Sequence, residues 1–425
     1  MQDRREFLRR AAVGAGLWGL PLARAEAAFG TEAPPLPPTA LLATDPGRYW
    51  AELRRQWLLA PDHINLNCGS VGCCPLPVLN AVIDHLLAAE AFREPAYPWF
   101  GYEENPRLRE LRDALAAFLH CRRDELALVR NATEGNNVVC NGLDLNAGDE
   151  VLLTDQEHPG GRCCWEQKAA RYGVKLNSVN LPRPPASVDD IVERFDRALT
   201  PRTRVMAFSH ITTVTGLVLP AKALCRLARD RGVLSHVDGA HAIGQIPLDL
   251  HDLACDFYAT SPHKWLLAPK GTGILYVREE VLDRLWVTIA SGEWQNRALK
   301  AYRFSNVGTS NLSVMVGLKA ALDFHQALGP ERIYARIHEL ARRVSDAIKQ
   351  YPRVRLANAT TDAFYGGLVT FEPVTGDLTG VQSALAARNI RVNGSPQRIR
   401  LATHVFTQPT ELNALFDALD RGLRA

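Results

Sequence analysis

Short apolar runs that alternate with amphipathic helical segments constrain the fold of this chain more than any other feature. Helical stretches such as PAKALCRLARDRG separate the runs EVLLTD, RVMAFSH, VLSHVDGA, DFYAT and GILYVR. Strands that alternate with helices build βαβ units, in which parallel strands form one sheet. We therefore predict an α/β fold with a mostly parallel sheet, and helices at WAELRRQWLLA, PLPVLNAVIDHLLAAEAF and NPRLRELRDALAAFLH.

The alternation loosens near Thr309, which indicates a second, smaller domain. A long helix is expected at NLSVMVGLKAALDFHQALG, and strands at GLVTFEP and RIRLAT. The chain has 425 residues, of which 47% are hydrophobic, enough for a large packed core. We predict four segments: a signal peptide at 1–25, an N-terminal arm at 26–60, a large domain at 61–310 and a small C-terminal domain at 311–425.

The first residues have the pattern of an export signal. Arg4 and Arg5 precede Phe7 and Leu8, a short apolar stretch follows, and Ala-Arg-Ala ends at Ala25. This order predicts a twin-arginine signal for the bacterial translocon, cleaved near Ala25, and a periplasmic protein. The apolar stretch is too short for stable membrane anchoring. The alternative is an amphipathic N-terminal helix of a cytosolic protein.

Charge and cysteine usage exclude several function classes. The formal net charge is +3, too small to indicate a nucleic-acid partner or an anionic membrane surface. The nine cysteines include no C-x-x-C pair, so we expect no metal site. Buried free cysteine packs as a small hydrophobe, and we expect most of them to do so.

Polar residues follow the apolar runs, where an open α/β sheet binds its ligands. NATEGNNVV places Ala132 and Thr133 at a helix start, and free N–H groups there bind phosphate. Thr133 could equally be an ordinary helix cap. TDQEHPGG places His158 just past a strand, where its ring could stack on a planar ligand or lie solvated in a loop.

VLSHVDGAH ends a strand at Asp238 and places His241 three residues later. A carboxylate in a partly dry site can hold a protonated pyridine nitrogen, and His241 could reach a neighbouring ring oxygen. The alternative is an Asp that caps the next helix.

TSPHKW follows the strand DFYAT and contains Ser261, His263 and Lys264. A lysine amine forms a Schiff base with an aldehyde when desolvation and nearby cations lower its pKa. Ser261 and His263 could serve a phosphate. A lone lysine at a strand end is otherwise a solvated charge.

The order of these motifs, from Asn65 to the C-terminus, resembles fold type I pyridoxal-phosphate (PLP) enzymes of the class V aminotransferase family. The resemblance implies a large domain with a mostly parallel seven-stranded sheet and a smaller α+β C-terminal domain. It also implies catalytic roles for Lys264, Asp238 and His158: covalent attachment, the pyridine nitrogen and ring stacking. His241 would face the phenolic oxygen, and the phosphate would be held by Ala132, Thr133, Ser261 and His263.

Two further motifs match the family. RFSNVGTSN implies that Gly308 and Thr309 reach the phosphate of the other subunit, hence a homodimer with shared active sites. RIRLATHVFTQPTEL implies that Arg400 binds the substrate α-carboxylate, with Arg398 as the fallback. A guanidinium fork suits such bidentate recognition.

The resemblance narrows the reaction. No cysteine follows Cys255, from which we infer that the chain is not a cysteine desulfurase. NLNCGSVGCCP and D-G-A-H look most like the isopenicillin N epimerase branch, which acts on a peptidyl amino-acid head group. An exported member resembles the periplasmic PLP enzymes of pyoverdine siderophore maturation. That implies conversion of the glutamate group on the chromophore precursor to succinamide by oxidative decarboxylation, with nitrogen retained.

Three alternatives stay open. The first is a periplasmic aminotransferase that turns the same glutamate into a keto acid. The second is an epimerase of a peptidyl amino-acid group. The third is a non-enzymatic binding protein that keeps the fold, which the loss of Lys264 or Asp238 would have favoured, although both are present.

Overall fold

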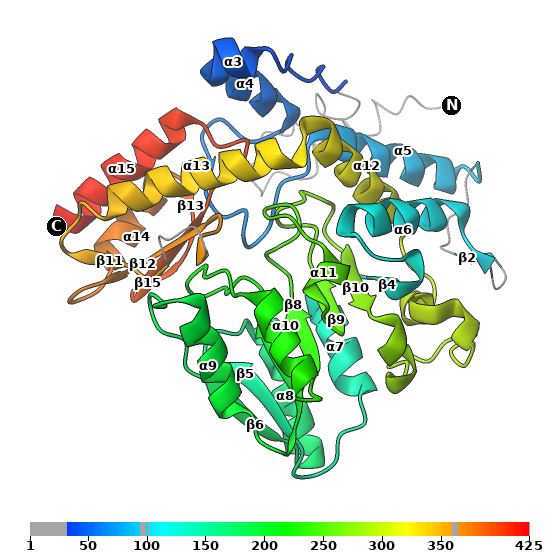
Figure 1. Ribbon diagram of the computed structural model, residues 1–425. Helices are drawn as coiled ribbons and strands as arrows, with labels where there is room; N and C mark the ends of the chain where they lie inside the picture. The colour runs from blue at the N-terminus through cyan, green and yellow to red at the C-terminus, as the bar shows by residue number, and fades with distance from the viewer. Residues whose placement is uncertain (1–31, 94–98, 101–102, 359–363, 425) are drawn as a thin grey trace, which may run out of the picture. The chain divides into compact units, whose positions relative to one another are not determined.

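The computed structural model describes residues 32–93, 99–100, 103–358 and 364–424. The predicted signal peptide, residues 1–25, lies outside the described residues. Contacts join Leu36–Ala425 into one compact unit, coloured along the chain in Figure 1. Within the described ranges, no helix is both long enough and apolar enough to cross a membrane.

A seven-stranded sheet forms the centre of the large domain. The sheet is mostly parallel, because only β10 runs antiparallel to its two neighbours. This confirms the predicted fold class. In spatial order the strands are β4 (Leu126–Val129), β10 (Gly273–Val277), β9 (Phe257–Thr260), β8 (Leu234–Asp238), β7 (Thr203–Ser209), β5 (Glu150–Thr154) and β6 (Lys175–Val179).

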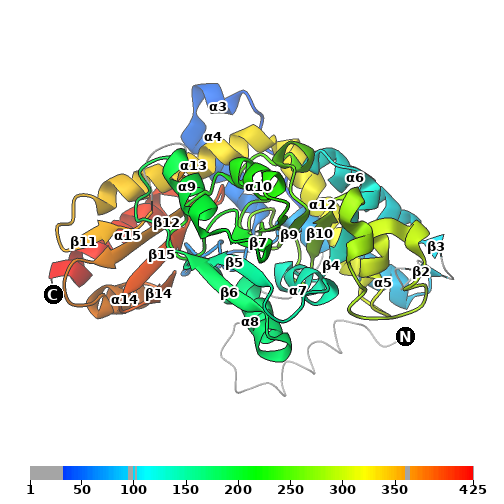
Figure 2. The ribbon, with the colours of Figure 1, turned by 60° about the horizontal axis from the view of Figure 1, so that its bottom comes forward.

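Both faces of this sheet are buried under helices. Along β7, Met206 and Phe208 join one hydrophobic core while Val205 and Ala207 join the other, because successive strand residues point to opposite faces. Figure 2 shows one pair of helices above the sheet and another below. The pair above is α9 (Val188–Ala198) and α10 (Ala221–Asp230); the pair below is α7 (Ala132–Gly142) and α8 (Pro159–Tyr172).

Local sequence explains where these helices begin and end. The side chains of Asn131 and Ser187 accept N–H groups in the first turns of α7 and α9, as good N-caps do. Pro159 occupies the first turn of α8, where its missing N–H costs nothing. Gly173 ends α8 with φ of 73°, a conformation that favours glycine. Because α7 and α8 begin only a few residues after β4 and β5, their N-termini lie at the carboxyl ends of those strands.

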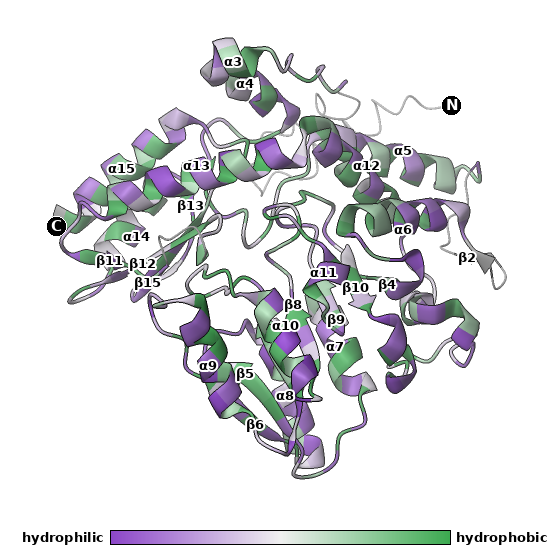
Figure 3. Cartoon of the chain, in the orientation of Figure 1, coloured by the Kyte–Doolittle hydropathy of each residue, from purple (hydrophilic) through white to green (hydrophobic). Residues whose placement is uncertain are grey.

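A second, antiparallel sheet of four strands builds the small domain. Its core includes Val369, Phe371, Leu340 and Leu415, from strand and helices alike. Figure 3 shows hydrophilic and hydrophobic residues mixed on the helices that cover it. The strands are β11 (Val354–Leu356), β12 (Leu368–Pro373), β15 (Arg398–Ala402) and β14 (Asn393–Ser395), and the helices are α13 (Pro330–Ile348), α14 (Thr379–Ala386) and α15 (Pro409–Arg424).

The N-terminal part of the chain contacts both the small and the large domain. Its strand β1 (Ile64–Asn65) pairs in parallel with β13 (Ile390–Arg391) of the small domain. Its helix α5 packs on the long helix α12 in the core beside β4. The remaining elements are α3 (Leu41–Thr44), α4 (Pro46–Leu53), α5 (Leu76–Glu90), β2 (Trp99–Phe100), β3 (Glu103–Glu104), α6 (Pro106–Leu119), α11 (Leu250–Leu253) and α12 (Leu312–Leu328).

One expected helix is shorter than the sequence pattern predicts. The stretch from Trp50 to Ala60 is helical only to Leu53, with a 3₁₀ turn at Arg54–Gln56. Trp57 then adopts an extended backbone, and its indole N–H donates to the Cys73 carbonyl at 2.9 Å. Trp57, which the periodicity assigned to the helix, is therefore held by this tertiary contact instead.

Candidate active site

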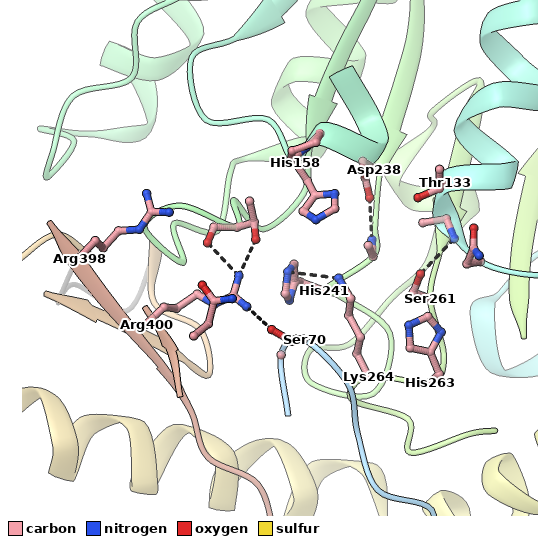
Figure 4. A pocket seen from close by; sticks show the side chains of 17 residues that line it. Ser70, Thr133, His158, Asp238, His241, Ser261, His263, Lys264, Arg398 and Arg400 are labelled. Atoms are coloured by element: carbon pink, nitrogen blue, oxygen red, sulfur yellow. Dashed lines mark hydrogen bonds between the residues drawn. The ribbon is translucent and has the colours of Figure 1, made fainter. Parts of the chain in front are cut away.

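One pocket of about 430 Å³ lies at the carboxyl ends of β5, β8 and β9 and extends to β15 of the small domain. This volume lies in the range of ordinary small-molecule sites. Figure 4 shows its labelled side chains converging from separate elements. Of the residues proposed from sequence, it is lined by Ala132, Thr133, His158, Asp238, His241, Ser261, His263, Lys264, Arg398 and Arg400.

The start of α7 forms an anion cradle at one end of the pocket. The Ser261 hydroxyl oxygen accepts the backbone N–H of Ala132 at 3.0 Å, so its own proton stays free to donate to a ligand. Thr133 lies in the same first turn. A Cβ on Gly160 would come within 2.5 Å of the Thr133 hydroxyl, so the glycine keeps this approach open. The helix N-terminus, two hydroxyls and His263 together suit a phosphate.

His263 borders this cradle with a neutral ring. Its Nδ1 lies 3.5 Å from the carbonyl oxygen of Thr272. Burial first, and the charge of Lys264 second, lower the pKa of His263. The ring therefore contributes a hydrogen bond to the cradle near neutral pH rather than a full charge.

Asp238 ends β8 as a buried carboxylate that is aimed into the pocket. One oxygen accepts the side-chain N–H of Asn136 at 3.0 Å, and the other accepts the backbone N–H of Ala240 at 2.9 Å. A turn, not a helix, follows Asp238, so the alternative role of helix cap is removed. A Cβ on Gly161 would lie 2.8 Å from the carboxylate, and glycine there leaves room beside it.

Lys264 lies deep in the pocket beside His241. Its Nζ is 3.4 Å from His241 Nε2, while the Trp265 indole N–H donates to His241 Nδ1 at 3.3 Å. The bond from Trp265 leaves the ring proton on Nε2, the atom that faces the lysine. Burial is the largest cause that lowers the pKa of Lys264 to about 8, the charge of Arg400 lowers it too, and Asp238 acts in the opposite direction. A substantial fraction of the amine is therefore neutral, and nucleophilic, near physiological pH.

His158 caps α8 and presents its ring to the pocket. Its Nδ1 accepts the backbone N–H of Gly160 at 2.9 Å, which fixes the ring orientation and places the proton on Nε2. Burial first, and the charge of Lys264 second, lower the pKa of His158. The imidazole is thus neutral and planar, as a stacking partner should be.

Arg400 supplies a buried guanidinium from the small domain. It donates to the carbonyl and hydroxyl oxygens of Thr213 at 3.1 and 2.5 Å, and to the Ser70 hydroxyl at 2.8 Å. Its Nε has no hydrogen-bond partner among the described residues. These contacts occupy three of five N–H donors, which leaves two for a carboxylate. Burial first, and the charge of Arg398 second, lower the pKa of Arg400 to about 10, so the group stays cationic at neutral pH.

This set of groups fits a phosphorylated pyridine aldehyde. The cradle matches its phosphate, the carboxylate its ring nitrogen, the neutral imidazole its ring face and the amine of lowered pKa its aldehyde. The family model "Aminotransferase class-V" matches residues 74–399. The chain belongs to the aminotransferase class V family.

Relatives and solved structures share most of their length with this class V chain. An isopenicillin N epimerase of Amycolatopsis lactamdurans is 36% identical over 392 residues, covering 87% of this chain and 98% of the relative. A cysteine desulfurase of Klebsiella pneumoniae is 34% identical over 266 residues, covering 59% and 64%. A solved C-DES mutant, with glycine covalently linked to its PLP cofactor, has a TM-score of 0.75 at 28% identity and covers 86% of this chain and 98% of its own. The protein is a PLP-dependent enzyme of fold type I.

One sequence-based conclusion is wrong. We excluded cysteine desulfurase activity because no cysteine follows Cys255, yet cysteine desulfurases are among the relatives. A second solved structure of this fold is a complex of the cystine C–S lyase C-DES with cysteine persulfide. Cleavage of a C–S bond by elimination needs a base at the α-carbon rather than a nucleophilic thiol. The missing late cysteine therefore excludes no such chemistry.

Two expected site residues lie elsewhere. Gly308 and Thr309 do not line this pocket, and Thr309 is exposed. Their assignment to a second subunit's phosphate stays a prediction, as do the individual roles of the pocket residues.

Four functional candidates were missed from the sequence. They are Ser70, Asn136, Thr213 and Asn393. Ser70 belongs to NLNCGSVGCCP, and Thr213 follows the strand RVMAFSH, so the strand-end rule could have found Thr213. Asn136 lies one turn inside its helix, and Asn393 lies on the edge strand β14, where no local pattern marks them.

Proposed function

We propose that the protein holds PLP covalently at Lys264 and changes a bond at the α-carbon of an amino-acid group whose α-carboxylate binds Arg400. The observation that carries this proposal is that Lys264 and Arg400 face one pocket, which Asp238 and His158 also line. The amine and the guanidinium lie on opposite sides of the space where an α-carbon would be held.

Different residues of the chain would act on the cofactor, on the α-carbon and on the substrate carboxylate. PLP, when bound, withdraws electrons from the substrate α-carbon. Asp238, held by Asn136 and Ala240, would keep the ring nitrogen protonated. Lys264, once released from the cofactor, would take or return a proton at the α-carbon, because its lowered pKa suits general-base catalysis near neutral pH. Arg400 would fix the substrate so that one α-carbon bond aligns for cleavage.

Epimerisation of an amino-acid group on a larger molecule is one form of this function. Its support is the match to two isopenicillin N epimerases, each covering 87% of this chain and 98% of the relative. Lys264 would remove the α-proton from one face of the α-carbon, and a proton from solvent would be added to the opposite face, which inverts the configuration. The experiment is incubation of a peptidyl amino acid in heavy water, where deuterium at the α-carbon without loss of carbon or nitrogen supports this form.

A narrower candidate uses the predicted export signal. We propose that the substrate is the glutamate group of a pyoverdine precursor in the periplasm, with a free α-amine and α-carboxylate. Conversion to succinamide replaces the α-carbon's carboxylate and hydrogen by a carbonyl oxygen. Each turnover then consumes one dioxygen and releases one carbon dioxide and one water, with nitrogen retained. The alternative at the same group is transamination to a keto acid.

Mass spectrometry of a γ-linked glutamyl siderophore precursor, incubated aerobically with the enzyme, separates these outcomes. Loss of one carbon with nitrogen retained supports oxidative decarboxylation. Exchange of nitrogen for oxygen with all carbons kept supports transamination. An unchanged precursor, with the visible absorbance of bound cofactor intact, removes the siderophore assignment and leaves the cofactor assignment standing.

We also propose that the protein is exported to the periplasm and works as a homodimer. Twin-arginine export carries folded cargo, so the cofactor can be inserted before transport. In the dimer, Gly308 and Thr309 of each chain would reach the other subunit's phosphate cradle. Cell fractionation with an Arg4→Lys, Arg5→Lys variant tests the export, since that variant should stay in the cytoplasm. Sedimentation of the holoenzyme as a monomer would contradict the dimer.

A further inference from the structure

Two arginines of one strand point into the same pocket. Arg398 and Arg400 are two residues apart on β15, so they lie on one face of the sheet with Cα atoms about 7 Å apart. Figure 4 shows both guanidinium groups at the side of the pocket opposite Thr133 and His263. The pair is therefore remote from the phosphate cradle.

The two guanidinium groups are in different states. Arg400 is buried and held by Thr213 and Ser70. Arg398 is half-buried, and its guanidinium has no ion pair or hydrogen bond with any part of the chain that the structure describes. The charge of Arg398 contributes to the lowered pKa of Arg400, so the two groups repel each other. Nothing on the described chain offsets this repulsion.

The charges that line the pocket leave one cation unmatched. Among the described lining residues, the permanent cations and the one amine are Arg398, Arg400 and Lys264, and the one carboxylate is Asp238. Asp238 and Lys264 serve the cofactor ring and aldehyde, and Arg400 serves the α-carboxylate. Arg398 then has no partner in a substrate that carries only one carboxylate.

We propose that the substrate carries a second carboxylate on its α-carbon substituent and that Arg398 binds it. This inference rests on the proposed function, because it takes Arg400 as the α-carboxylate site, and it opposes the pyoverdine candidate, in which the side-chain carboxyl of the glutamate is the point of linkage. Arg398 is more exposed than Arg400 and lies across from Ser395 of the exposed edge strand β14. The second carboxylate therefore lies toward the open side of the pocket, where the rest of a larger substrate can extend into solvent. Arg398 determines specificity and takes no part in bond cleavage.

Paired amino acids test the inference. L-Glutamate and L-glutamine have nearly the same shape and differ in one charge at the side-chain end. Each is titrated into the PLP-loaded holoenzyme, and binding is followed by the change in cofactor absorbance and by calorimetry. We expect glutamate to bind about tenfold more tightly than glutamine, the size of a charge-assisted hydrogen bond at a partly exposed site.

Variants then assign the preference to one side chain. In Arg398→Gln the preference for glutamate should fall to about one, with glutamine affinity unchanged. Arg398→Lys should restore part of it, because a charge remains without the planar fork. Arg391→Gln is the matched control, since Arg391 is an exposed arginine of the same domain that does not line the pocket. Thermal melting of each variant checks that it folds.

The outcomes separate this inference from the function on which it rests. A wild-type protein without preference, or an Arg398→Gln variant that keeps it, overturns the inference and leaves the proposed function in place. An equal loss of affinity for both amino acids in Arg398→Gln also overturns the inference, because Arg398 then acts on the α-carboxylate or on pocket shape. A holoenzyme that binds neither amino acid, by spectrum or heat, overturns the inference; the proposed function is overturned as well if the peptidyl amino acid and the siderophore precursor also leave the cofactor spectrum unchanged.

Discussion

The two ends of the pocket are built in different ways. At the cofactor end, the groups come from residues at or just past the carboxyl end of a large-domain strand: Thr133, His158, Asp238 and Lys264. At the substrate end, Arg400 comes from the small sheet and is held by Ser70 and Thr213, which lie on separate loops. The cofactor end is therefore a property of one sheet, whereas the substrate end requires three distant segments to meet.

Electrostatics separates the ends as well. At the cofactor end, burial lowers the pKa of Lys264 and of the three histidines, so that neutral imidazoles and a partly neutral amine face the ligand. At the substrate end, two guanidinium groups stay charged and repel each other. The first arrangement suits a covalent bond and proton transfer, and the second suits recognition of carboxylates. Changes at the first end should thus affect the spectrum and the chemistry, and changes at the second should affect substrate affinity.

Lys264→Ala should give the largest effect. Loss of the amine removes the covalent bond to the cofactor and the base at the α-carbon, so we expect turnover to fall by about 10³-fold or more and the visible absorbance of lysine-bound cofactor to disappear. Absorbance spectra and turnover are measured on the purified variant. Lys270→Ala, an exposed lysine nearby, is the control and should behave as wild type. Retention of the band in Lys264→Ala would show that another lysine binds the cofactor.

Asp238→Asn should lower turnover by about 10²–10³-fold while cofactor still binds. The substitution keeps the shape and removes the charge that would hold the ring nitrogen protonated. Steady-state kinetics and cofactor titration measure the two effects. Asp230→Asn, an exposed acid on α10, is the matched control. If Asp238→Asn kept full turnover, the carboxylate would have only a structural role.

Arg400→Gln should act on substrate affinity and leave the cofactor spectrum intact. Loss of a buried charged partner costs about 2–5 kcal/mol in comparable sites, so KM should rise by about a hundredfold for a substrate with a free α-carboxylate. The comparison of the ends requires this split between spectrum and KM. An unchanged KM would move the α-carboxylate to Arg398, and an altered spectrum would show that the two ends are not separable.

The smallest expected effect is a shift in the pH at which Lys264 captures PLP, because charges at both ends of the pocket act on this lysine. The neutral amine of Lys264 attacks the aldehyde, so capture of PLP by the apoprotein should rise with pH through about 8 and level off above it. Arg400 lowers and Asp238 raises the pKa of Lys264. Arg400→Gln should therefore move the midpoint to higher pH and Asp238→Asn to lower pH, as followed by stopped-flow absorbance. Midpoints that move in the same direction in both variants would contradict this electrostatic account.

The contrast between the ends also explains what the sequence could predict. Asp238 ends one apolar strand and Lys264 follows the end of another by four residues, so strand-end position alone brings them to one edge of the sheet. Thr213 and Ser70 contact Arg400 from more than 180 residues away, and no local pattern carries such a contact. Their part of the site depends on how the small domain packs, which periodicity does not determine.

The strands of the large domain also divide into those that a local sequence pattern predicts and those that it misses. Strands β5, β7, β8, β9 and β10 were predicted because they are buried, apart from Arg204 of β7, and contain short apolar runs. The edge strand β6 has the sequence KLNSV, of which only Val179 is buried, and lacks that signal. Buried β4, whose sequence is LALV, was also missed.

The most direct test of the account is chemical mapping of the cofactor lysine. The holoenzyme is reduced with borohydride, digested, and its peptides are sequenced by mass spectrometry. The account predicts one pyridoxyl-phosphate adduct, on Lys264, and none on the neighbouring Lys270. An adduct on any other lysine, or the absence of an adduct in a protein that shows the visible band before reduction, would contradict it.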